Sequence, residues 1–262
     1  MIRRSSVLAR IESLIPTPLN DFVRRCLAFF KWVPYQAISF AQEGEDIILG
    51  RIFGSQSSGF YVDIGAHHPR RFSNTYLFYC RGWRGINIDA MPGSMAPFNR
   101  IRSRDINLEI PVMRQRGKLT YYQFNEPALN GFSKDLSDSR NGLNDYKILR
   151  TIDIEGKPLS EILYEHIPLN TEIEFLSVDV EGLDLEVLES NDWSRFRPKV
   201  VLAEVLANSL ATIQANPICR FMENNRYQVY AKAVNTVFFL SEEYLEAREA
   251  EGRKIDKSEP LF

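Results

Sequence analysis

The chain has 262 residues, of which 44% are hydrophobic, 12% aromatic and 25% charged, and its formal net charge is −2. A chain of this length and composition buries a large hydrophobic core, which excludes disorder as its main state. The 32 basic and 34 acidic residues are nearly balanced, without the basic excess typical of proteins that bind duplex nucleic acid. We therefore expect a globular protein of one large domain, with or without an extension, that does not bind nucleic acid.

The three cysteines are odd in number, widely spaced and form no Cys-x-x-Cys pair: Cys26, Cys80 and Cys219. This pattern predicts neither a disulfide framework nor a zinc site built on thiolates, and it favours a reducing compartment. No apolar run approaches the ~18 residues of a membrane span. Arg10 and Pro16 interrupt the apolar core that a signal peptide needs. We expect a cytoplasmic protein.

Residues 1–34 form a leader whose charge differs from that of the rest of the chain. It holds six Lys or Arg residues against two acidic ones, a balance of +4. Its apolar residues follow helical spacing on either side of Pro16 and Pro18. We interpret the leader as a helical arm that packs on the main body or on a second subunit of a homo-oligomer. A weak peripheral contact with an anionic membrane is the alternative. Residues 35–240 are expected to form the main domain and 241–262 a charged tail.

The main domain alternates strands and helices. Residues 60–89 contain a β-rich run, a short helix that ends at Gly82, and a second β-rich run, which is the size of a βαβ unit. The nearly continuous apolar runs at 173–180 and 199–205 are typical of buried parallel strands. Further strands are expected at 106–112, 119–124, 227–231 and 236–240, and further helices at 46–53, 159–166 and 183–188. Residues 125–145 are rich in Asn, Ser, Asp and Gly, and we interpret them as a long loop that acts as a binding lid.

The first candidate site is the turn after the run 60–64. Asp63, Gly65 and Ala66 occupy this turn, and Asp89 follows Gly65 by 24 residues, the spacing between a glycine turn and an acid that binds ribose hydroxyls. The turn lacks the further glycines that a pyrophosphate requires, and a carboxylate there would repel a phosphate. S-adenosylmethionine has no phosphate and carries an ammonium and a sulfonium. The sequence therefore predicts that these residues bind S-adenosylmethionine.

The second candidate site is the pair Asp179 and Glu181, at the end of the run 173–180. In extended backbone alternate residues point the same way, so the two carboxylates are expected to share a face. They would hold a substrate cation or a divalent metal, or act as the general base. The structural alternative is that one of them caps the following helix. Glu204, at the end of the next strand, would complete an acidic opening.

His67 and His68 are the reserve candidates for the base, because histidine titrates near neutral pH and the pair lies beside the predicted cofactor turn. Adjacent side chains in extended backbone face opposite ways, so only one of them, taken as His67, is expected to reach the site.

The runs 42–46, 61–66, 88–92, 175–188, 197–204 and 235–239 together resemble the FkbM family of S-adenosylmethionine-dependent methyltransferases, over residues 39–240. The resemblance implies an α/β fold: a class I methyltransferase Rossmann-like three-layer sandwich with a mostly parallel seven-stranded sheet and an antiparallel last strand. It also implies that Glu109 stands where the family contacts adenine. His67 and His68 stand where the family often has Asn and Gly.

These observations together predict an enzyme that methylates a hydroxyl of a carbohydrate or a secondary metabolite. The acceptor is thus a small molecule or a glycan, and no metal is assigned. Two alternatives remain open. One is a metal-dependent glycosyltransferase that uses Asp179 and Glu181, and the other is a non-catalytic protein that binds the cofactor.

Overall fold

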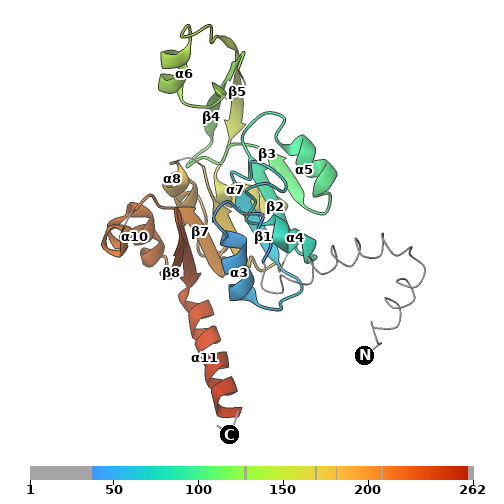
Figure 1. Ribbon diagram of the computed structural model, residues 1–262, viewed down its shortest axis with the longest axis vertical. Helices are drawn as coiled ribbons and strands as arrows, with labels where there is room; N and C mark the ends of the chain where they lie inside the picture. Colours follow the sequence, from blue (N-terminus) through green and yellow to red (C-terminus); the bar gives the residue numbers. More distant parts are fainter. Residues whose placement is uncertain (1–36, 127–128, 169, 181, 208, 259–262) are drawn as a thin grey trace, which may run out of the picture. The chain divides into compact units, whose positions relative to one another are not determined.

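The computed structural model describes residues 37–126, 129–168, 170–180, 182–207 and 209–258 (Figure 1). The predicted helical arm at 1–34 lies outside these residues, as does Glu181. Across the residues that are described, no helix is both long enough and apolar enough to cross a membrane.

A seven-stranded sheet forms the centre of the domain, with strand order β3-β2-β1-β6-β7-β9-β8. Its strands are β1 (Phe60–Ile64), β2 (Arg84–Asp89), β3 (Ile106–Glu109), β6 (Phe175–Val178), β7 (Val200–Glu204), β8 (Tyr227–Ala233) and β9 (Thr236–Ser241). Strand β1 pairs in parallel with both β2 and β6, whereas β9 runs antiparallel to both β7 and β8. The prediction of a mostly parallel sheet with an antiparallel last strand is confirmed.

Helices cover both faces of this sheet because the strands alternate their buried side chains between two apolar clusters. One cluster joins Val62 and Ile64 of β1 to helices α7 (Leu159–His166), α8 (Asp184–Glu189), α9 (Leu210–Ala215) and α10 (Pro217–Asn224). The other joins Tyr61 and Phe175 to helices α3 (Glu45–Phe53) and α4 (Tyr76–Cys80), with α11 (Glu242–Ser258) beside them. Helix α5 (Met95–Ile101) packs on the turn after β1. The layers are those of a three-layer sandwich.

Residues 113–156 form an insertion between β3 and α7. It consists of the antiparallel pair β4 (Gly117–Phe124) and β5 (Ile148–Gly156) and the short helix α6 (Lys134–Arg140) between them. A parallel bridge between Val112 and Lys157 closes its base. In Figure 1 the insertion extends beyond the ends of β1 and β2, and its strands form a sheet of their own.

The insertion and the third strand are where the structure departs from the element predictions. The expected loop at 125–145 contains α6, whose N-cap Ser133 accepts a hydrogen bond from the backbone N–H of Leu136, and β5 was not expected. The sequence does not predict β5 because the strand is mostly exposed and contains no continuous apolar run. The expected strand at 106–112 ends at Glu109, two residues before Pro111, which has no backbone N–H to donate to a sheet.

Candidate active site

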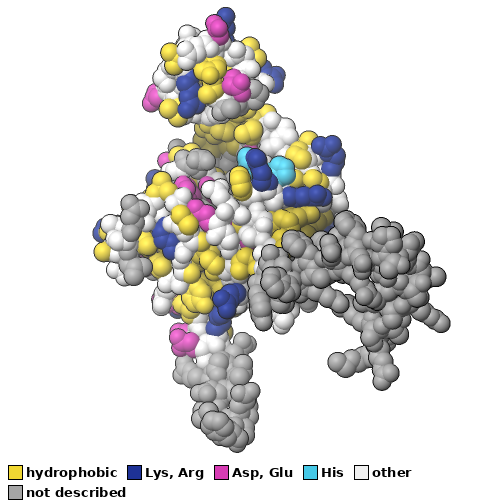
Figure 2. All heavy atoms as spheres, viewed as in Figure 1, with side chains coloured by type: hydrophobic (Ala, Val, Ile, Leu, Met, Phe, Trp, Pro, Cys, Tyr) yellow, Lys and Arg dark blue, Asp and Glu magenta, His cyan; other side chains and the backbone are white. Residues whose placement is uncertain are grey.

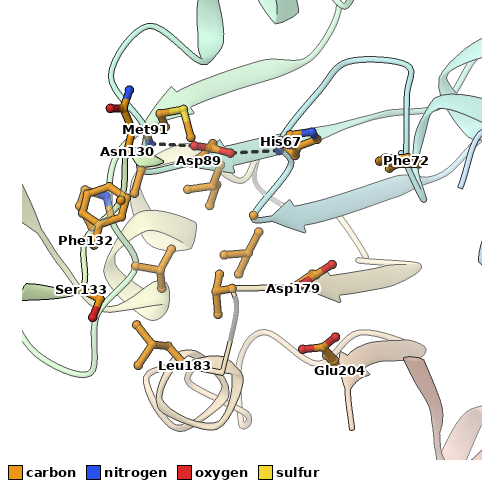
Figure 3. Close-up of a pocket in the computed structure, with 18 of the residues that line it drawn as sticks. His67, Phe72, Asp89, Met91, Asn130, Phe132, Ser133, Asp179, Leu183 and Glu204 are labelled. Carbon is orange, nitrogen blue, oxygen red and sulfur yellow. Dashed lines mark hydrogen bonds between the residues drawn. The ribbon is translucent and has the colours of Figure 1, made fainter. Parts of the chain in front are cut away.

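A cavity of about 940 Å³ opens at the carboxyl ends of β1, β2, β6 and β7. Parallel strands of an α/β sheet present their ligand sites at this edge. Residues 42–45 and the turn between β8 and β9 complete the sheet side of the cavity, and the insertion lines the opposite side. Figure 3 shows this arrangement, with Asp89, Asp179 and Glu204 on the sheet side and Phe132 and Ser133 on the insertion side. The predicted lid therefore does line the site.

Asp89 ends β2 and lines the cavity, and backbone donors hold both of its carboxylate oxygens. One oxygen accepts from the N–H of His67 at 3.0 Å and the other from the N–H of Met91 at 2.7 Å (Figure 3). These bonds fix the orientation of the carboxylate before any ligand arrives. Each oxygen keeps a further lone pair, so the carboxylate retains the capacity to accept from two ribose hydroxyls.

Gly65 brings the end of β1 against the end of β6. Its φ is +80°, and a Cβ atom added to it would lie 1.8 Å from the backbone oxygen of Asp179. The backbone N–H groups of Gly65 and Ala66 both donate to the Ile88 oxygen of β2, so three strand ends meet at this turn. Only glycine fits this position, because both the left-handed backbone and the close contact exclude a side chain. Ala66 lies under the turn, where it packs on Met95 and Phe98 of α5.

Asp63 lies beneath the cavity and does not line it. Its carboxylate is buried and accepts from the Thr75 hydroxyl at 2.8 Å. The same hydroxyl accepts from the guanidinium of Arg102, at 2.8 Å. Burial raises the pKa of the Asp63 carboxyl above its ordinary value, and the positive charge of Arg102 opposes that rise. Asp63 thus ties β1 to the residues before α4, and this geometry gives it a positioning role under the predicted cofactor turn.

A network of buried polar groups extends from this point. Arg102 pairs with Asp105 at 2.9 Å, and both side chains are fully buried. The Tyr61 hydroxyl bonds to both of them, at 2.7 Å to each. Asp105 also accepts from the Asn87 side chain of β2 at 3.0 Å. The network joins β1, β2 and the residues directly after α5, so buried hydrogen bonds and an ion pair connect the strands that carry the sheet side of the site.

The two histidines take different positions in the loop after β1. His67 lines the cavity, with a φ of +50°, and its Nε2 lies 3.3 Å from the Arg71 guanidinium. The His68 Nδ1 accepts from the backbone N–H groups of Arg70 and Arg71 and stabilises the loop. Burial, followed by the charge of Arg71, lowers the pKa of His68. In Figure 2, His side chains (cyan) lie next to Lys or Arg side chains (dark blue) on the face that is shown.

The carboxylates on the sheet side outnumber the pair that the sequence predicted. Asp179 is exposed in the cavity, and Glu204 lines it from the end of β7, as expected. Its predicted partner, Glu181, is outside the described residues. Glu43 and Glu45 also line the cavity. Within the described part of the chain, no group of three or more His, Cys, Asp or Glu side chains is arranged to hold a metal ion.

Glu43 and Glu45 show why two distant motifs belong to one site. A Glu43 carboxylate oxygen accepts from the backbone N–H of Asn235 at 2.8 Å, and Glu45 accepts from the Thr236 hydroxyl at 3.2 Å. The runs 42–46 and 235–239 are therefore joined at the cavity edge. Both runs carry the family resemblance, but the sequence alone does not place them at the site; the signal in the sequence is the acidic pair at the start of α3.

Glu109, the predicted adenine contact, lies outside the cavity. Its side chain is exposed, and one carboxylate oxygen is 3.4 Å from the backbone N–H of Met95 in α5. The next three residues, Ile110, Pro111 and Val112, line the cavity. An apolar surface thus occupies the end of β3, beside Asp89.

The sheet order and the acidic cavity at the carboxyl ends of its strands define a class I methyltransferase fold. The family model of the methyltransferase FkbM domain matches residues 63–229, more than half of the chain, and the protein belongs to this family. Its cofactor is S-adenosylmethionine. No curated protein and no solved structure matches the chain.

The residues of the cavity fit this cofactor. Among the residues that the structure describes, five carboxylates line it: Glu43, Glu45, Asp89, Asp179 and Glu204. Such a lining suits a ligand with ribose hydroxyls, an ammonium and a sulfonium, and it opposes a pyrophosphate. The apolar residues at the end of β3 suit a flat base next to Asp89. The carboxylates and apolar residues of the cavity therefore agree with the cofactor of the family.

Proposed function

We propose that this methyltransferase transfers a methyl group to a hydroxyl of a carbohydrate or a secondary metabolite. The supporting observation is the position of Asp179. Its carboxylate is exposed in the cavity, and its backbone contacts Gly65 at the predicted cofactor turn. We assign to this carboxylate the removal of a proton from an acceptor that enters beside the insertion.

We assign cofactor binding to Asp89 and to the turn at Gly65 and Ala66, with Asp63 supporting that turn from below. When bound, the cofactor supplies an activated methyl group on a positively charged sulfonium. The protein then has two tasks, which are to hold the acceptor hydroxyl in position and to remove its proton. Positioning is the larger contribution when the geometry is held tightly.

Asp179 is our choice for the general base, ahead of His67. The Nε2 atom of His67 lies within bonding distance of the Arg71 guanidinium, which only donates. A neutral His67 in this arrangement carries its proton on Nδ1, and its one basic nitrogen is occupied. Asp179 is held by its backbone, because its N–H donates to the Ile64 oxygen at 3.0 Å.

The Asp179→Asn variant tests this role. A placed base contributes about 10² to 10⁴-fold to the rate. We expect kcat for methyl transfer from labelled cofactor to a hydroxyl acceptor to fall by that factor, while affinity for the demethylated product S-adenosylhomocysteine changes little. The matched control is Asp192→Asn, because Asp192 lies outside the cavity. Near-normal kcat in Asp179→Asn, at saturating cofactor, would remove Asp179 from the mechanism.

The acceptor class has its own test. The protein is incubated with labelled S-adenosylmethionine and with glycan and metabolite fractions, and the products are identified by mass spectrometry. We expect the label on an oxygen. Label found only on nitrogen or carbon would contradict O-methylation, and cofactor binding without any labelled product would favour a non-catalytic protein.

A further inference from the structure

The charges that line the cavity are separated between its two sides. All five carboxylates belong to the sheet side. On the insertion side the described lining residues include Arg140, the last residue of α6, and no Asp or Glu. Among the described lining residues Arg140 is the only Lys or Arg. The cavity thus presents negative charge at one side and a single guanidinium at the other.

Arg140 differs from the other partly covered cations of the chain. Its side chain is half-buried, yet it makes no hydrogen bond or ion pair with any described residue. All other described Lys and Arg side chains that are buried or half-buried have a bonding partner: Arg102, Lys157, Arg197, Lys199, Lys232 and Arg248. A guanidinium stays charged at every accessible pH, so its partial burial without an acceptor costs free energy.

We propose that the acceptor is a sugar that carries an anionic group, a carboxylate or a phosphate, and that Arg140 binds this group. The inference rests on the proposed methylation of a carbohydrate hydroxyl and names its substrate class. The planar fork of a guanidinium matches both anions through two parallel hydrogen bonds. Such bonds would satisfy Arg140 and place the sugar between the insertion and Asp179.

The surroundings of Arg140 suit a sugar ring. Asn130, Phe132 and Ser133 line the cavity from the insertion (Figure 3). The Phe132 ring is supported by Tyr121, at 5.2 Å between ring centroids. A fixed aromatic ring with a few polar groups around it is the usual composition of a site for a small polar ligand.

The cofactor itself carries a carboxylate, which is the competing partner for Arg140. The placement of Arg140 argues against it. Gly65 and Asp89, to which we assign cofactor binding, lie on the sheet side, whereas Arg140 lies across the cavity on α6. If Arg140 bound the cofactor carboxylate, its loss would weaken the binding of S-adenosylhomocysteine.

The test compares Arg140→Gln with Lys134→Gln. Both variants remove one positive charge from α6, but Lys134 is exposed, pairs with Asp138 and does not line the cavity. Each protein is saturated with S-adenosylhomocysteine and titrated by calorimetry with glucose, glucuronate and glucose 6-phosphate. A charge-assisted pair predicts that wild type and Lys134→Gln bind at least one anionic sugar about tenfold or more tightly than glucose. Arg140→Gln should lose that preference and keep its affinity for S-adenosylhomocysteine.

Three results would overturn the proposal. They are equal or undetectable binding of all three sugars to wild type, a preference that survives in Arg140→Gln, and a loss of S-adenosylhomocysteine affinity in that variant. The comparison of glucuronate with glucose 6-phosphate shows whether Arg140 prefers a carboxylate or a phosphate. The proposed function fails separately: binding that depends on Arg140, without methyl transfer to any hydroxyl, ends that function and leaves the anion site standing.

Discussion

The two sides of the cavity are built differently. The sheet side stands on strand ends whose backbones bond to one another at Gly65 and Ile88, above the buried pair Arg102 and Asp105. The insertion is supported mainly by its own hairpin and by the bridge from Val112 to its base. Helix α6 has one buried side chain, that of Ser137.

This difference agrees with the two tasks that we propose for the two sides, cofactor binding on the sheet side and acceptor binding on the insertion. A cofactor binds more tightly to side chains that are already fixed in the folded protein, because binding then loses no free energy to ordering them. Asp89, held by two backbone donors, is such a group. An acceptor site on a separate hairpin can change without disturbing the sheet. We therefore expect variants on the sheet side to alter stability or cofactor affinity, and variants on the insertion to alter acceptor choice.

The largest effect is expected from Arg102→Met, which removes the guanidinium from the buried network that supports the sheet side. The change leaves the fully buried Asp105 carboxylate without its cation, and loss of one partner of a buried ion pair costs about 3–5 kcal/mol. The free energy of unfolding, measured in urea, should fall by this amount.

The control is Arg100→Met, because Arg100 is exposed on the same helix. We expect it to change the free energy of unfolding by no more than about 0.5 kcal/mol. Hydrogen exchange should show that β1 and β2 lose protection in Arg102→Met while the β4–β5 ladder keeps most of its own. Equal losses of protection in the sheet and in the β4–β5 ladder would show that the insertion depends on the buried network, so the two sides of the cavity would not be independently stable.

An intermediate effect is expected from Asp89→Asn, which leaves the fold intact. The amide group cannot accept at both positions, so one backbone donor or one ribose hydroxyl loses its partner. Hydrogen bonds to a charged group contribute about 1.5–3 kcal/mol, so affinity for S-adenosylhomocysteine should fall roughly tenfold to hundredfold by calorimetry. NAD should bind to neither protein.

Glu109→Gln is the matched control for Asp89→Asn, since Glu109 also ends a strand but lies outside the cavity. We expect it to keep the wild-type affinity. A comparable loss in both variants would restore Glu109 as the adenine contact that the family resemblance implied.

The sheet side was largely predictable from sequence because short-range chemistry determines it. Gly65 must be glycine where the chain turns against Asp179, and Asp89 follows from the size of a βαβ unit. The role of Asp63 was not predictable in the same way. Its carboxylate turns down to Thr75 and Arg102, residues that become its neighbours only when α4 and α5 pack on the sheet.

The insertion was less predictable because its residues obey no single period. Strand β5 is mostly exposed, and its short alternation of Ile152 and Ile154 with exposed polar residues follows directly on a long polar segment. In the sequence Arg140 is one basic residue within the polar segment 125–145. Its significance comes from the fold, which places it over a cavity of carboxylates about 40 residues or more away along the chain. No local sequence pattern predicts that residues so far apart along the chain line the same cavity.

The smallest effect is expected at the rim between the two sides, from His68→Asn. The His68 Nδ1 atom accepts two backbone N–H groups only while the ring is neutral, and its pKa is lowered from the ordinary 6.5. The unfolded chain therefore binds this proton more readily than the folded chain. The stabilisation by His68 is complete above about pH 6.5 and is lost as the pH falls through the lower, folded pKa.

The asparagine of the His68→Asn variant supplies a hydrogen-bond acceptor that does not titrate. Stability at about pH 8 should thus stay within about 0.5 kcal/mol of wild type, while the decline toward about pH 5 becomes shallower in urea unfolding. An unchanged slope would show that the loop after β1 is not held by this ring, and the fixed position of His67 beside Asp89 would then need another cause.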